Sequence, residues 1–172
     1  MAPMWEQYQS WRERRRAQTL VDSLEQWHKI CMNVTQICAQ ALLDQAAVEG
    51  DIGEVLDGAD RKLYAFRNHM TEARREINRH NPALARRITQ VTEDVYRLRN
   101  QTARFLIRAQ GPHPFAGGRP TEENLRNAYY YKALEEVGFQ GREIAERLQK
   151  DTSDLWGDLQ PLLNRAQKAL QI

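Results

Sequence analysis

The stretch from Leu56 to Ala109 reads LDGADRKLYAFRNHMTEARREINRHNPALARRITQVTEDVYRLRNQTARFLIRA. An apolar residue returns at every seventh position of it, eight times in all: Leu56, Leu63, Met70, Ile77, Leu84, Val91, Leu98 and Phe105. A second set lies three or four positions away: Ala59, Phe66, Ala73, Ile88, Val95, Thr102 and Ala109. This heptad pattern is typical of helices that pack along a shared seam. The stretch therefore predicts long, packed helices.

The composition of the whole chain agrees with a helical protein. Its 172 residues include only nine Gly and six Pro, and 8% are aromatic. A chain of this length suits one domain with a sizeable core. We expect an all-α fold in a single domain over residues 1–172, an elongated antiparallel bundle of four to five helices with heptad seams. Its parts are an aromatic and basic segment at 1–16, long helices at 17–110, a Gly/Pro loop at 111–120 and C-terminal helices at 121–172.

Capping residues predict where the helices begin and end. The first helix is expected from Leu20 to about Gly50, with the second starting near Ile52. Asn81 before Pro82 is a strong start signal for a third helix, so residues 52–110 form a helical hairpin. One long kinked helix stays the alternative, because the seven-residue repeat runs on through Pro82. In the C-terminal region, Gly138 predicts a helix end and Arg142 the start of a last helix.

Charge is unevenly distributed along the chain. Residues 59–119 carry thirteen basic and five acidic residues, whereas residues 20–58 carry one Lys and seven acids. If the basic residues share a face, several could contact phosphates. The alternative is a solvated or internally salt-bridged flank. The nucleic-acid-binding candidates are Arg67, Arg74, Arg75, Arg79, Arg86, Arg87, Arg97 and Arg104.

The segment before the first long helix combines aromatic and basic residues. Met4, Trp5, Tyr8 and Trp11 lie at helical spacing and precede a run of Arg from Arg12 to Arg16. We expect these aromatics to fold back on the bundle as its cap; the alternative is docking on an anionic membrane surface or a partner. In the Gly/Pro loop, Phe115 is a candidate exposed anchor. The partner-binding candidates are Trp5, Tyr8, Trp11 and Phe115.

Residues for catalysis or metal binding are few. The chain has four His, and no Gly-rich phosphate loop or Cys/His metal cluster is found. Cys31 and Cys38 lie seven positions apart, about 10 Å along one helix face, which is too far for a disulfide and suits two packed core thiols. We expect no enzyme activity, no catalytic residues, no cofactor and no metal.

Two short motifs resemble known families. Arg75 to His80 resembles the Arg-x4-6-His motif of HEPN-domain ribonucleases, which implies an all-helical RNA-cleaving dimer with this Arg and His in a shared cleft; Glu76 replaces the usual polar residue. Residues 135–148, followed by Asp151 as cap of a recognition helix, resemble the helix-turn-helix of sigma-factor region four, although Gln149 stands where that family usually has Gly.

These patterns together favour a protein that binds other macromolecules. The expected function is a non-enzymatic helical interaction or assembly module that binds a protein partner or a second copy of itself. A nucleic-acid-binding protein that uses the Arg-rich middle helices, with a possible C-terminal helix-turn-helix pair, is the first alternative, and a HEPN-like ribonuclease is the second. No apolar run reaches the length of a transmembrane segment and no signal peptide is found, so the expected location is the cytoplasm.

Overall fold

The computed structural model describes residues 2–43, 52–109 and 122–171. Within these ranges, only the backbone is described at 41, 43, 52–57, 59–60, 65–66, 68–69, 105–109, 122–135 and 137–138. Four α-helices fill the described ranges: α1 (Met4–Leu43), α2 (Ile52–His80), α3 (Pro82–Ala109) and α4 (Glu122–Leu170). Because the described residues contain no β-strand, the predicted all-α class is confirmed.

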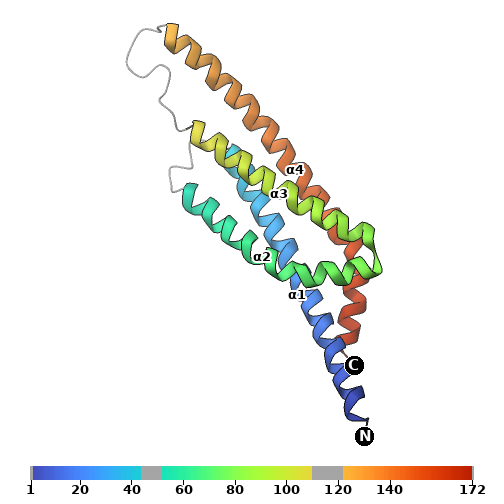
Figure 1. Ribbon diagram of the computed structural model, residues 1–172. Helices are drawn as coiled ribbons and strands as arrows, with labels where there is room; N and C mark the ends of the chain where they lie inside the picture. Colours follow the sequence, from blue (N-terminus) through green and yellow to red (C-terminus); the bar gives the residue numbers. More distant parts are fainter. Residues whose placement is uncertain (1, 44–51, 110–121, 172) are drawn as a thin grey trace.

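The helices form an elongated bundle in which each runs opposite to the one before it (Figure 1). α1 contacts all three other helices, and its longest contact is with α4. α3 also packs against α2 and α4. α1 is therefore the central helix of the bundle. Its first turns and the last turns of α4 extend together past the turn between α2 and α3 (Figure 1).

The heptad positions of the sequence supply the core, as predicted. Leu63, Met70, Ile77 and Leu98 are at most 2% exposed, and Val91 is buried with them. Leu84, in the first turn of α3, is only half-buried and packs against the edge of the core. The seams therefore bring the apolar side chains together inside one chain.

Four polar side chains inside the core form hydrogen bonds. The indole Nε1–H of Trp27, in α1, donates to Thr92 Oγ1, in α3, over 3.0 Å. The buried hydroxyls of Thr35, Thr102 and Thr152 each donate to the carbonyl four residues earlier, at 2.7–2.8 Å. Satisfying these groups removes the cost of burying them.

The α2–α3 turn forms where the sequence predicts it. The Asn81 carboxamide Oδ1 accepts a hydrogen bond from the Leu84 backbone N–H at 3.2 Å, which is the geometry of a helix N-cap. Pro82 is the first residue of α3, where its missing N–H costs nothing. The two helices pack against each other as a hairpin, so the alternative of one kinked helix is wrong.

α4 corrects the prediction for the C-terminal region. We expected a helix end at Gly138 and a new start at Arg142, and the resemblance to a helix-turn-helix implied a turn after residue 148, but α4 is one helix from Glu122 to Leu170. A Gly inside a helix costs only about 1 kcal/mol, which packing readily offsets. Here the buried positions Ala145, Leu148, Leu155 and Leu159 hold α4 against the core without interruption.

α1 corrects the prediction for the N-terminal region. The segment 1–16 is not a separate cap, since α1 starts at Met4 and runs unbroken through Leu20 to Leu43. The predicted end of this helix at Gly50 and the whole Gly/Pro loop at 111–120 lie outside the described residues, as does Phe115.

Candidate functional site

Four large side chains in the first turns of α1 are exposed to solvent. Met4 is 86% exposed, Trp5 61%, Tyr8 59% and Trp11 53%, so the expectation that they fold back on the bundle is wrong. The sequence of α1 explains why. The positions that would continue its core seam toward Met4 are Ala17, Glu13, Ser10 and Glu6, which are mainly polar and do not belong in a core. We call Met4, Trp5, Tyr8 and Trp11 the aromatic stripe.

Two rings of the aromatic stripe, Tyr8 and Trp11, contact neighbouring side chains. Tyr8 and Trp11 stack with their ring centroids 6.0 Å apart, and the Arg15 guanidinium lies 5.3 Å from the Trp11 ring centroid. This spacing is within the range of a cation–π interaction. The Arg15–Trp11–Tyr8 arrangement therefore combines positive charge with exposed aromatic surface on one side of α1.

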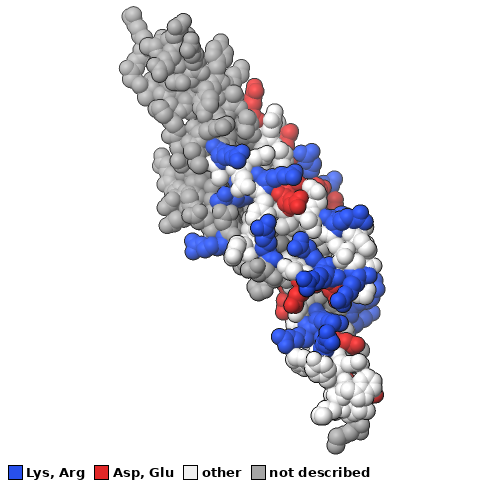
Figure 2. All heavy atoms as spheres, in the orientation of Figure 1, with Lys and Arg blue, Asp and Glu red and all other residues white. Residues whose placement is uncertain are grey.

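A groove of about 470 Å³ lies between this side of α1 and the last turns of α2. Five Arg side chains line it: Arg12, Arg15, Arg16, Arg75 and Arg79. Tyr8 and Trp11 form part of its wall, and Glu72 and Glu76 are its acidic members. We call this the basic groove. Lys and Arg side chains also dominate the surface around the α2–α3 turn and the adjoining part of α1 (Figure 2).

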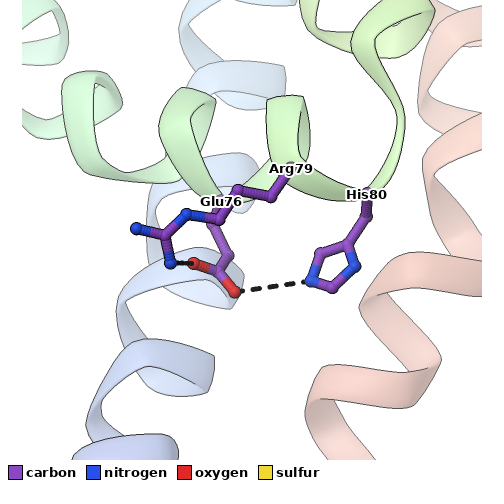
Figure 3. Close-up of polar contacts among 3 residues, drawn as sticks. All are labelled: Glu76, Arg79 and His80. Atoms are coloured by element: carbon purple, nitrogen blue, oxygen red, sulfur yellow. Dashed lines mark hydrogen bonds and ion pairs between the residues drawn. The ribbon is translucent and has the colours of Figure 1, made fainter.

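Glu76 is held by its neighbours on α2. Figure 3 shows its carboxylate between Arg79 and His80, with Oε2 3.4 Å from Arg79 Nη1 and Oε1 3.5 Å from His80 Nε2. Arg79 thus lies on the α1 side of α2, whereas His80 lies on the α4 side (Figure 3). His80 lines a second groove, of about 420 Å³, together with Leu162 and Arg165 of α4.

This placement separates the two ends of the ribonuclease-like motif. Arg75 lines the basic groove and His80 the second groove, so one chain does not bring the two side chains into one cleft. The geometry within the chain lends no support to the cleft that the HEPN resemblance implies.

The eight Arg residues predicted to bind nucleic acid do not share one site. Arg67 lies over the Tyr96 ring, at 5.6 Å from its centroid, and Arg74 Nη1 donates to Thr89 Oγ1 at 3.5 Å, both between α2 and α3. Arg75 and Arg79 belong to the basic groove.

The four predicted nucleic-acid-binding residues on α3 lie at other sites on the surface. Arg87 Nη1 pairs with Asp158 Oδ2 of α4 at 2.6 Å, and Arg97 lies 3.8 Å from Asp94. Arg86 Nε donates to the Pro82 carbonyl at 3.5 Å, and Arg104 is exposed. Much of the Arg run is thus in contact with other groups of the bundle, as the salt-bridged alternative expects.

The sequence pattern does not show that Arg12, Arg15 and Arg16 of α1 line the same groove as Arg75 and Arg79 of α2. The two groups are about sixty positions apart, and a heptad repeat does not reveal which turns of two helices lie side by side. The charge cluster itself is visible in the sequence, but its position in a groove is not.

The two cysteines are buried, as predicted. Cys31 and Cys38 are both unpaired and 0% exposed. Burial raises the pKa of the Cys31 thiol to about 12 and also raises the pKa of the Cys38 thiol. Both thiols therefore stay protonated near neutral pH and are poor nucleophiles. Over the part of the chain with described side chains, no group of three or more His, Cys, Asp or Glu could hold a metal ion.

Comparison with known proteins finds no similar protein. The chain matches no protein-family model, no curated protein and no solved structure. Among the helices in the described ranges, none is long and apolar enough to span a membrane.

Proposed function

We propose that the protein is a non-enzymatic interaction module that binds a protein partner through the aromatic stripe and the basic groove. The observation that supports this most directly is the exposure of Trp5, Tyr8 and Trp11 on a helix that extends beyond the α2–α3 turn. Contiguous exposed apolar surface with a polar rim is typical of interaction sites, and Trp, Tyr and Arg dominate binding energy at interfaces. The proposed compartment is the cytoplasm.

The test compares a double variant and a single variant, each of which removes exposed aromatic rings. In Trp5→Ala/Trp11→Ala the stripe is lost, and in Tyr64→Ala an equally exposed ring is lost from α2, where Tyr64 is 70% exposed. The affinity-tagged protein and each variant are used to capture partners from an extract of the source cells. Quantitative mass spectrometry then compares the proteins captured by each variant with those captured by the unchanged protein. We expect the stripe variant to lose a defined partner that Tyr64→Ala retains, because truncating an interface Trp commonly costs about 2 kcal/mol or more.

Self-association is measured on the same proteins. A second copy could also cover the stripe, and light scattering during size-exclusion chromatography then gives a mass above one chain that the stripe variant reduces to one chain. If the stripe variant changes neither the captured proteins nor the mass, the proposed function is wrong.

A further inference from the structure

The basic groove has the shape of a site into which one more helix could pack. Its α1 wall contains Tyr8, Trp11, Arg15 and Thr19, at intervals of three and four residues, with Arg12 and Arg16 beside them. Side chains at this spacing form one stripe along a helix, and such a stripe is what a second helix covers when two helices pack. α1 thus carries two seams, a core seam that starts at Leu20 and this outer one.

The place of the outer seam in the bundle explains why it is open. α2 packs along α1 but ends at His80, where the chain turns into α3, while α1 extends past that turn (Figure 1). A helix laid in the groove would lie along α1 beside the last turns of α2. From Tyr8 to Thr19 the seam is about 17 Å long, which corresponds to about three turns of a partner helix.

The charge of the groove selects the kind of helix. Five Arg face two Glu, and Glu76 is already close to Arg79 and His80. Bringing a basic or neutral helix into this groove would leave the Arg groups without acceptors, whereas carboxylates spaced three or four residues apart can pair with them. The rings of Tyr8 and Trp11 add an apolar contact that a purely acidic segment does not use.

From this we infer that the basic groove binds an acidic amphipathic helix of a partner protein, with its carboxylates on the Arg side chains and its apolar side chains on Tyr8 and Trp11. The inference rests on the proposed function and specifies the chemistry of the partner.

The test uses a defined probe in place of the natural partner. The probe is a fluorescent helical peptide of about three heptads with Leu at a and d and Glu at e and g, and its control has Lys in place of Glu. Fluorescence anisotropy gives the Kd at low and high salt. We expect the full-length protein to bind the Glu peptide, to bind it about tenfold more weakly at high salt, and not to bind the Lys peptide.

Matched variants locate the binding site. Arg15→Glu and Arg75→Glu reverse one charge on each wall of the groove, and Arg104→Glu makes the same change at an exposed site on α3 outside it. We expect each groove variant to weaken binding by about tenfold and Arg104→Glu to leave it nearly unchanged. Circular dichroism checks that all three variants keep their helix content.

Three results would overturn the inference. The first is that the protein binds the Glu and Lys peptides equally well, or binds neither peptide. Another is an equal effect of Arg104→Glu and the groove variants. The third is tighter, groove-dependent binding of single-stranded RNA or of phosphatidylserine vesicles, which would assign the groove to those ligands. If the peptide fails but Trp5→Ala/Trp11→Ala still removes a captured protein, the proposed function stands without the acidic helix.

Discussion

His28 illustrates how a single side chain couples packing to pH. Its imidazole stacks on the Trp156 indole with ring centroids 4.4 Å apart, joining α1 to α4. Burial lowers the pKa of His28 from its ordinary value of 6.5, because the charged form loses hydration. The unfolded chain therefore binds a proton at His28 more readily than the folded chain does.

The first prediction follows from this difference. The contribution of His28 to the free energy of unfolding is fully present above pH 6.5 and is lost as the pH falls below it toward the folded-state pKa. His28→Phe keeps a ring against Trp156 but cannot be protonated, so its stability should fall less between about pH 7.5 and pH 5. Urea unfolding at each pH measures the difference between the two proteins. Identical pH dependence would show that His28 has no part in it.

At the scale of a helix, two of the three glycines of α4, Gly141 and Gly157, are tolerated for different reasons. A Cβ atom on Gly157 would meet nothing within 4 Å, whereas a Cβ on Gly141 would lie 2.9 Å from Leu42 Cδ1 of α1. Gly141 thus permits a close approach of α4 to α1, and Gly157 has no such role.

The second prediction compares these two positions. Gly157→Ala should stabilise the protein by about 0.5–1 kcal/mol, because Ala loses less backbone entropy in a helix. Gly141→Ala should stabilise it less, since Leu42 has to shift to make room. Chemical denaturation of the two variants gives both values. Equal stabilisation would mean that the contact with Leu42 does not restrict position 141.

Sequence patterns predict the helices best where the signal is local. Asn81 and Pro82 determine the α2–α3 turn through a cap and a fixed backbone angle, and both effects act within a few residues. Gly138 failed as a helix end because the packing of distant α4 residues against the core outweighs a local preference. The basic groove could not be predicted, because it depends on which turn of α1 lies beside Arg75.

At the scale of the whole molecule, we expect the first turns of α1 to contribute little to the free energy of unfolding of the bundle. Met4, Trp5, Tyr8 and Trp11 are each more than half exposed and add little to the core. The third prediction is that removing residues 1–11 changes Tm by no more than about 2 °C, since the apolar surface buried on folding is nearly the same. Thermal unfolding followed by circular dichroism measures the change. A much larger loss of Tm would mean that this part of α1 stabilises the bundle.

α1 contains neither Gly nor Pro between Met4 and Leu43. Its first sixteen residues, up to Leu20, extend about 24 Å in line with the part that is packed at the centre of the bundle. The helix is therefore continuous from its exposed first turns into the core of the bundle. A partner that binds the first turns of α1 also fixes the direction of the long axis of the molecule. Attachment here transmits direction as well as position, and the outward faces of α3 and α4 are then presented at a defined angle.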